Sequence, residues 1–296
     1  MDITVDVDHL PAPGETILGG AARFAPGGKG ANQAVAAARL LNQVGTVLMA
    51  GCVGDDAFGE QLTAALRAEG IDATGLRHTR AASGIAMITV DATGENVITV
   101  APGANAEVSD NELDFLITTR PDLLVISAEI PLGTVRDALV ADTGATTLLN
   151  LAPAPQQAAA LIARGVDWLI VNETEAGAVL GHSVAGLDGS AKAAGELTAL
   201  GPKNAVVTAG PAGAAMAGER GTETVPGFQV HAVDSVGAGD TFVGALAVAL
   251  AQGVEPAAAI RAASAAGAAA ATRPGAQSGM PRPADIESAT GYRWPV

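Results

Sequence analysis

The chain has 296 residues, enough for one large α/β domain or two small ones with a substantial buried core. Its 16 Lys and Arg face 31 Asp and Glu, and the resulting net charge of −15 argues against nucleic acid or an anionic membrane as the main partner. Apolar residues make up 49% but aromatic residues only 3%, so the core must consist mainly of Ala, Val, Leu and Ile.

Cys52 is the single cysteine, which excludes an intrachain disulfide and fits the reducing cytoplasm. It lies in an apolar run, so we expect a small buried side chain rather than a nucleophile. The longest apolar stretch, 242–250, is too short to span a bilayer, and the acidic N-terminus does not suit a signal peptide.

The first hundred residues mix two kinds of pattern. One is typical of an α/β layer, with strand, helix, strand and helix expected at 1–7, 31–41, 47–53 and 57–68. The other is alternating, at 84–90 and 96–100 around the turn 91–94, and predicts a hairpin. Because this hairpin and the segment 3–24 interrupt the α/β order, we expect them to form a small separate sheet.

From residue 122 the chain alternates short apolar strands with helices. Strands are predicted at 123–127, 146–151, 168–171 and 205–208, and helices at 132–141, 156–163, 173–180 and 190–200. Short antiparallel strands are expected within 216–231, followed by Ala-rich helices at 241–252 and 256–272. This order predicts an α/β fold with a mostly parallel central sheet covered on both faces. The chain shows no internal repeat and no linker.

The stretch Asp234-Ser-Val-Gly-Ala-Gly-Asp-Thr-Phe242 combines glycines with a carboxylate before a long helical pattern. Free N–H groups at a helix start form an anion site, and glycines let a ligand approach the backbone. Asp240 has two interpretations from this stretch alone. It could be a helix N-cap, or a base that takes a proton from a nucleophile.

Polar residues also follow three of the predicted strands. They are Glu129, the pair Asn172 and Glu175, and the segment 208–213. Because ligands bind at the carboxyl ends of strands in open α/β sheets, these residues are candidates for one site. A carboxylate and an amide at a helix start suit water-held Mg²⁺ near phosphates, but both residues could equally be helix caps. The segment 208–213 could be an ordinary turn.

Three common motifs are excluded. Gly28-Lys29 is not part of a P-loop, because Arg23 and Gly30 stand where that motif needs Gly and Ser or Thr. Phe242 occupies the third glycine position of a dinucleotide fingerprint. The four histidines have no metal-ligand spacing.

The chain resembles the ribokinase family of carbohydrate kinases, which includes the PfkB sugar kinases, from Asp2 to about Pro283. Two signatures carry the resemblance: Pro26-Gly-Gly-Lys-Gly-Ala-Asn-Gln-Ala-Val-Ala-Ala-Ala-Arg39 and the stretch 234–242. Asn172-Glu-Thr-Glu175 matches the family's Asn-x-x-Glu element. The first signature, with Glu129-Ile-Pro and Asn150-Leu-Ala-Pro-Ala, is more similar to the ribose-specific branch than to fructose or adenosine kinases. The resemblance implies a single three-layer α/β/α domain over 1–296 with a small β-sheet lid, formed by about 3–24 and 84–101.

The resemblance implies ATP-dependent phosphorylation of D-ribose at O5, with Asp240 as catalytic base. The amides of Gly237, Ala238 and Gly239 would stabilise the transferring phosphoryl group. The sugar would be held by Asp2, Gly28, Lys29, Gly30, Ala31, Asn32, Glu129 and Asp240. A lone Lys in a glycine-rich loop is usually solvated, but its neighbours here favour a side chain that faces the ligand.

For the nucleotide, the resemblance implies contacts from two glycine-rich segments, one strand end and one helix. These residues are Asn172, Thr208, Ala209, Gly210, Pro211, Ala212, Gly213, Gly239, Asp240 and Ser264. Glu175 would hold Mg²⁺ through water. An activating monovalent cation, usually K⁺, would lie at Asp234, Val236, Ala270, Arg273, Gly275 and Gly279, mostly on backbone carbonyls. The lid would close over the sugar, exclude water and form a homodimer interface.

The sequence leaves two points open, the start of the chain and the substrate. Family members normally have a strand before the position of Asp2, so either the start is assigned too late, which we favour, or the chain is a shortened paralogue. The rival functions are a kinase for a nucleoside, deoxyribose or fructose, and a catalytically weak sugar-binding protein. A shortened paralogue would make the last of these plausible.

Overall fold

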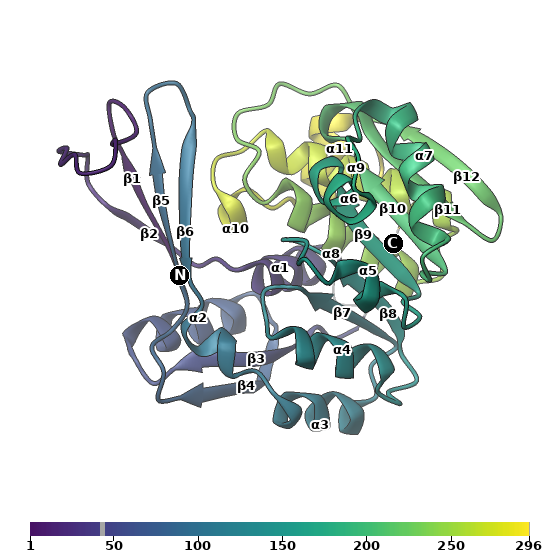
Figure 1. The fold of residues 1–296 in the computed structure, drawn as a ribbon, viewed down its shortest axis with the longest axis horizontal. Helices are drawn as coiled ribbons and strands as arrows, with labels where there is room; N and C mark the ends of the chain where they lie inside the picture. Colours follow the sequence, from purple (N-terminus) through teal and green to yellow (C-terminus); the bar gives the residue numbers. More distant parts are fainter. Residues whose placement is uncertain (42–44, 296) are drawn as a thin grey trace.

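The computed structural model describes residues 1–41 and 45–295, and its largest sheet has six strands (Figure 1). The strand order is β12-β11-β10-β9-β8-β7. The four strands β7 to β10 are parallel, and β11 and β12 are added antiparallel at one edge. The bounds are β7 Leu123–Ser127, β8 Thr146–Asn150, β9 Trp168–Asn172, β10 Asn204–Thr208, β11 Gly213–Gly218 and β12 Gly221–Pro226.

Helices cover both faces of this sheet. One face packs against α1 (Lys29–Leu41), α8 (Ala238–Ala251), α9 (Pro256–Ala271) and α11 (Pro283–Thr290). The other face packs against α3 (Asp110–Thr119), α4 (Leu132–Val140), α5 (Ala158–Ile162), α6 (Glu173–Leu180) and α7 (Gly186–Thr198). Neighbouring residues of β8, Leu148 and Leu149, are both fully buried on opposite faces, as expected for a parallel sheet between two helical layers.

A second, separate parallel sheet of two strands lies on the β7 side of the six-stranded sheet. It consists of β3 (Leu48–Gly54) and β4 (Asp72–Thr79), with α2 (Ala57–Ala68) between them in sequence. Within residues 1–41 and 45–295, β3 pairs only with β4, and β7 pairs only with β8. Residues 48–53 of β3 and all of β7 line one cavity of about 850 Å³. The edges of β3 and β7 that have no strand partner among the described residues therefore border the same cavity.

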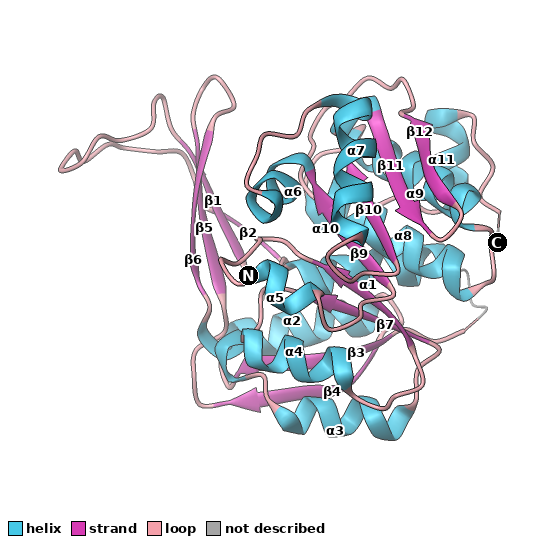
Figure 2. Cartoon of the chain, turned by 45° about the vertical axis from the view of Figure 1, so that its right-hand side comes forward, coloured by secondary structure: helices cyan, strands magenta, loops and turns pink. Residues whose placement is uncertain are grey.

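A four-stranded sheet stands apart from these layers, on the left in Figures 1 and 2. Its order is β2-β1-β5-β6, with bounds β1 Asp2–Asp6, β2 Arg23–Ala25, β5 Ile85–Val90 and β6 Asn96–Ala101. The strand register puts Asp2, Ala86 and Ile88 on the face that lines the cavity. We call this four-stranded sheet the lid sheet.

The predicted α/β/α layers and the small separate sheet are confirmed, and most differences lie at element ends. Helix α8 begins at Ala238, three residues before the predicted start, because Gly237 has a left-handed backbone (φ 78°) and caps the helix. Within the predicted antiparallel region, strand structure ends at Pro226. Strand β4 and helices α3, α10 (Ala276–Gly279) and α11 were not predicted. None of the helices in the described residues is long and apolar enough to cross a membrane.

Candidate active site

Asp240 lies in the first turn of α8, and its carboxylate is buried with only 8% of the residue exposed. Its two oxygens accept hydrogen bonds from Asn32 Nδ2 at 2.9 Å and Gln33 Nε2 at 3.1 Å. The N-cap of α8 is Gly237, so the interpretation of Asp240 as the cap is wrong. Burial raises the pKa of Asp240 above its ordinary value, while Lys29 and the two amides act to lower it.

Gln33 was missed as a site residue, although it follows Asn32 directly in the glycine-rich signature. It is 2% exposed, and its Oε1 is buried without a hydrogen-bond partner.

Helices α1 and α8 pack closely next to the hydrogen bonds that Asn32 and Gln33 donate to Asp240. A methyl group on Gly244, one helical turn beyond Asp240, would lie 2.6 Å from Gln33 O and 2.8 Å from Ala36 Cβ. Glycine at 244 therefore allows α1 to bring its amides to the carboxylate.

The glycine-rich loop leads directly into α1 and carries most of the predicted sugar ligands. Gly28 has φ 95°, which favours glycine, and this turn directs the Lys29 N–H to Glu129 Oε2 at 2.8 Å. The Asp2 carboxylate packs against the Cα of Gly27, where a methyl group would lie 2.1 Å from Asp2 Oδ2. The loop, β1 and the end of β7 thus meet in one place.

All the predicted sugar ligands line the same cavity: Asp2, Gly28, Lys29, Gly30, Ala31, Asn32, Glu129 and Asp240. Burial raises the pKa of Asp2 and of Glu129 above the ordinary values, and the Lys29 charge opposes both shifts. Lys29 is half-buried rather than fully solvated. A cation among carboxylates suits a neutral polyol, whose hydroxyls need both donors and acceptors.

The start of α8 carries the predicted anion site. Gly237 lines the cavity beside Asp240. The first N–H groups of a helix have no partner within the helix. Here the Ala238 N–H donates to Ser235 O at 3.2 Å, so a phosphoryl group would have to share or displace that bond. Residues 237–239 thus lie at a helix N-terminus beside the cavity, with the Ala238 amide already engaged.

Of the predicted nucleotide residues, Asn172 and residues 208–213 lie at the ends of the neighbouring strands β9 and β10, outside this cavity, whereas Asp240 on α8 lines it. Asn172 and Glu175 form a capping box on α6, with Asn172 N–Glu175 Oε2 at 2.9 Å and Glu175 N–Asn172 Oδ1 at 2.8 Å. Capping is therefore one role of both residues, but each acceptor oxygen retains a second lone pair. Burial raises the pKa of Glu175 above its ordinary value, and Lys29 opposes this shift.

Residues 208–213 follow β10. Gly210, Pro211 and Ala212 are exposed, whereas Ala209 and Gly213 are buried. The Ser264 hydroxyl on α9 is buried without a hydrogen-bond partner. The structure thus places the predicted nucleotide segment at the carboxyl edge of the sheet, with its exposed part in the short helix 210–212.

The predicted cation residues lie on two loops joined by Asp234 and on the adjoining helices, with Ala270 in α9 and Gly279 in α10. Its Oδ2 accepts from Gly275 N at 2.8 Å, and its Oδ1 accepts from Val236 N at 3.0 Å. A methyl group on Gly279 would lie 3.2 Å from Arg273 O and 3.5 Å from Ala270 O. Carbonyl oxygens thus converge on Gly279, the kind of ligand that K⁺ takes. In the part of the chain that the structure describes, no group of three His, Cys, Asp or Glu is arranged to hold a metal.

Cys52 is buried as predicted, with 5% of the residue exposed. Burial is the main cause that raises the pKa of its thiol to about 12, and Arg77 Nη2 lies 3.1 Å from Sγ. A thiol with this pKa has almost no thiolate at neutral pH, which agrees with a packing role.

The sequence matches the family model described as pfkB family carbohydrate kinase over residues 1–283. The chain belongs to the pfkB family of carbohydrate kinases. Among curated members, it is 35% identical to the ribokinase of Haemophilus influenzae (95% of this chain, 92% of the relative). It is 37% identical to the ribokinase of Bacillus subtilis (97% and 95%). It is also 36% identical to the deoxyribokinase of Salmonella typhi (83% and 81%).

Solved structures of pfkB relatives share the fold. The ribokinase of Thermotoga maritima superposes with a TM-score of 0.88 at 34% identity, covering 97% of this chain and 95% of that one. The ribokinase of Arabidopsis thaliana, complexed with ribose and ATP, gives 0.82 at 27% identity (97% and 94%). The phosphofructokinase-2 of Escherichia coli, in complex with potassium, gives 0.78 at 26% identity (97% and 94%). The chain therefore has the three-layer pfkB fold, and it is a carbohydrate kinase.

Proposed function

We propose that this pfkB kinase transfers the γ-phosphoryl group of ATP to O5 of D-ribose. The observation that carries the proposal is the buried Asp240 carboxylate at the start of α8, in one cavity with Lys29 and Glu129. Ribokinases at 35% and 37% identity over nearly the whole chain support ribose as the acceptor.

In the proposed reaction, an oxygen of Asp240 takes the proton of the ribose 5-hydroxyl. The O5 lone pair forms the new bond to Pγ, and the bond from Pγ to the β–γ bridging oxygen breaks, so that ADP leaves. The backbone at 237–239 stabilises the charge on the transferring group. A raised pKa suits Asp240 to this task, because a more basic carboxylate accepts a proton more readily.

Lys29, Glu129 and Asp2 orient the sugar in this scheme. The two carboxylates accept hydrogen bonds from ribose hydroxyls, and the Lys29 ammonium donates to a hydroxyl oxygen. Lys29 also limits the repulsion among the buried carboxylates around it. The Lys29 charge therefore serves both binding and the ionised state of Asp240.

Two cations complete the proposed site. Mg²⁺ with water ligands, held beside Glu175 and the phosphates, would neutralise phosphate charge when bound. The arrangement fits, because the described residues offer single carboxylates rather than an all-protein cage. K⁺ fits the carbonyl oxygens around Gly279, next to the Asp234 loop that leads into α8. The potassium complex of a pfkB relative supports this choice.

We also propose that the outer face of the lid sheet joins two copies of the chain. Strand register puts Ile3, Val5, Phe24, Met87 and Val97 on the face opposite to the cavity. Phe24, Met87 and Val97 are 58%, 46% and 53% exposed. An apolar sheet face of this kind is typical of a protein–protein interface.

The opposite face of the lid sheet, which lines the cavity, would close over the sugar and exclude water.

A further strand, we propose, completes the sheet between β3 and β7. Both strands turn an open side toward one cavity, with α1 and α8 on one flank and α3 and α4 on the other. Buried backbone groups without partners are costly, and a strand parallel to both neighbours would satisfy them. Met1 lies at this cavity, where its ammonium group donates to Gly84 O at 2.8 Å.

ATP as co-substrate and the single buried Cys52 suit the cytoplasm, where we place the enzyme.

The test of the reaction is ADP formation from ATP with ribose, 2-deoxyribose, fructose and a nucleoside, with phosphorus NMR to locate the phosphate. We expect the highest kcat/KM for ribose and a product phosphorylated at O5. A higher kcat/KM for 2-deoxyribose would favour the second candidate, which the 36% identity to a deoxyribokinase supports. Sugar binding without ADP formation would instead indicate a sugar-binding protein.

A further inference from the structure

The Asp240 carboxylate begins a chain of side-chain amides that leads away from the site. Asn32 Nδ2 donates to Asp240 Oδ2 at 2.9 Å, and Gln277 Nε2 donates to Asn32 Oδ1 at 3.1 Å. An ionised carboxylate only accepts, so the NH₂ of Asn32 must face it. The Asn32 oxygen then needs a donor on its other side, which is the Gln277 amide. Gln277 on α10 thus donates to Asn32 on α1, and Asn32 donates to Asp240 on α8.

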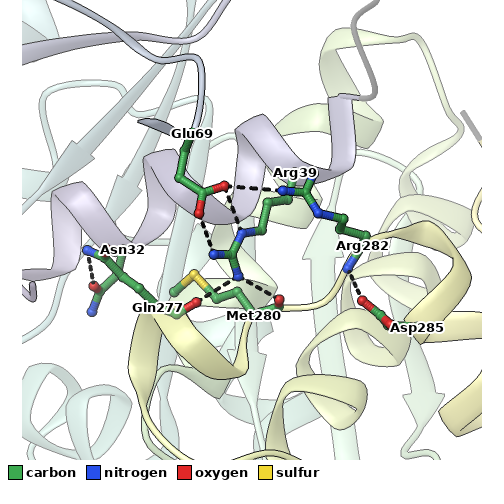
Figure 3. A network of polar contacts seen from close by, with 7 residues as sticks. All are labelled: Asn32, Arg39, Glu69, Gln277, Met280, Arg282 and Asp285. Atoms are coloured by element: carbon green, nitrogen blue, oxygen red, sulfur yellow. Dashed lines mark hydrogen bonds and ion pairs between the residues drawn. The ribbon is translucent and has the colours of Figure 1, made fainter. Parts of the chain in front are cut away.

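The segment that carries Gln277 is also held by its backbone (Figure 3). Arg39 Nη1 donates to Gln277 O at 2.7 Å and to Met280 O at 2.8 Å. Arg39 is itself held by Glu69, with Nε–Oε2 at 3.0 Å, and only 14% of its side chain is exposed. Asn32 and Arg39 are seven residues apart on α1, so they lie on one face about two turns apart. Helix α10 therefore contacts that face of α1 at two points.

The same short segment borders the proposed cation loop. Gln277 lies between Gly275 and Gly279, and Gly275 N donates to Asp234 Oδ2 at 2.8 Å. Gln277 thus connects the loop on one side with the Asn32–Asp240 contact on the other. The function outlined above does not use this residue, and its sequence context gave no reason to select it.

We propose that Gln277 is a positioning residue, which fixes the orientation of the Asn32 amide and so keeps an N–H donor on the catalytic base. This inference rests on the proposed role of Asp240. Without the Gln277 donor, the Asn32 amide loses the contact that fixes its orientation, and its oxygen can turn to accept a hydrogen bond from the protonated Asp240 carboxyl. The base would then lose one of its two amide donors, and its pKa would rise further, because the Asn32 hydrogen bond acts to lower it.

Two variants separate this role from simple packing. Gln277→Met keeps the length of the side chain but removes the donor. Gln277→Glu keeps the shape but offers an oxygen, which draws the Asn32 NH₂ away from Asp240. The acidic limb of the kcat/KM–pH profile reports the protonation of the base. We expect it to shift to higher pH in the order wild type, Met, Glu, with kcat/KM at neutral pH reduced about tenfold for Gln277→Glu.

Gln61→Met on α2 is the matched control, because Gln61 is exposed and is not among the residues that line the cavity. We expect its pH profile to match that of the wild type. In an Asn32→Ala background, Gln277→Met should cause no further shift, because the residue acts through Asn32. Carbon-13 NMR of the Asp240 carboxyl gives its pKa without turnover, so the inference is tested separately from the reaction. Wild-type pKa values for Asp240 in both Gln277 variants, or additive effects in the double variant, would overturn it.

Discussion

The backbone N–H of Lys29 donates to Oε2 of Glu129 at 2.8 Å, although the two residues are 100 positions apart in the chain. This bond joins the glycine-rich loop to the carboxyl end of β7. It places the Lys29 ammonium among carboxyl groups whose pKa values burial raises, including Asp2 and Asp240. Lys29 therefore both anchors the loop that we propose to hold the sugar and supplies the charge that favours an ionised Asp240.

Lys29→Met should move the acidic limb of the kcat/KM–pH profile upward. The pKa of Asp240 is already raised, so activity of the wild type should fall at a pH above the ordinary value of about 4 for Asp. Lys29 lowers that pKa, and its loss therefore favours the protonated, inactive form. Profiles at constant ionic strength measure the shift. An unchanged limb with only a higher KM for ribose would limit Lys29 to sugar binding.

Asp240→Asn should reduce kcat by about 10²–10⁴-fold, the usual contribution of a general base. Ribose binding, measured by calorimetry, should stay within a few fold of wild type, because Asp2, Lys29 and Glu129 remain. Asp114→Asn makes the same chemical change at an exposed site on α3 and should have wild-type activity. Activity of Asp240→Asn within a few fold of wild type would remove the carboxylate from the mechanism.

K⁺ should activate the enzyme more than Na⁺ does. Carbonyl oxygens of Arg273, Pro274 and Ala270 gather around Gly279, and Asp234 ties that loop to the segment that leads into α8. Asp234→Ala removes the acceptor of both the Gly275 and Val236 amides, so the preference for K⁺ should be lost. Initial rates in each salt, after removal of residual K⁺, give the comparison. Equal wild-type rates in both salts would contradict a selective site.

Val97→Asp should dissociate the proposed dimer, because it puts a charge on the apolar outer face of the lid sheet. Val140→Asp on α4 is a close control, since Val140 is 56% exposed and Val97 is 53% exposed. Light scattering during gel filtration gives the mass of each variant. A wild-type protein that is monomeric at micromolar concentration would rule out this interface as a stable contact.

Extension of the protein upstream of Met1 tests the proposed strand between β3 and β7. A strand that pairs with both should raise the melting temperature and slow amide hydrogen exchange in β3 and β7. It should also raise turnover, because the cavity that contains the site would become smaller and drier. Exchange in β9 serves as an internal control, since both its sides are already paired. Equal exchange in β3 and β7 with and without the extension would count against the strand.

Sequence reasoning located the layers well because short apolar strands between helices leave few alternatives. Strand β7 and helices α2 and α6 have the predicted bounds. It missed β4, whose Asp72, Thr74 and Arg77 break the apolar pattern, because its stability comes from pairing with β3. It also missed Gln277, whose proposed role depends on a contact with a residue 245 positions away. Contacts of that range leave no trace in local periodicity.

Gly244 marks a contact between α1 and α8 that leaves no room for a larger side chain. A side chain there would wedge α1 away from α8 and withdraw Gln33 and Asn32 from the carboxylate one turn earlier. The seam between these helices therefore has almost no tolerance for added volume. The cavity-facing lid residues Ile98 and Val100, 55% and 60% exposed, have no such constraint. Redesign toward other sugars should therefore vary the lid strands and leave every residue of the helix seam as it is.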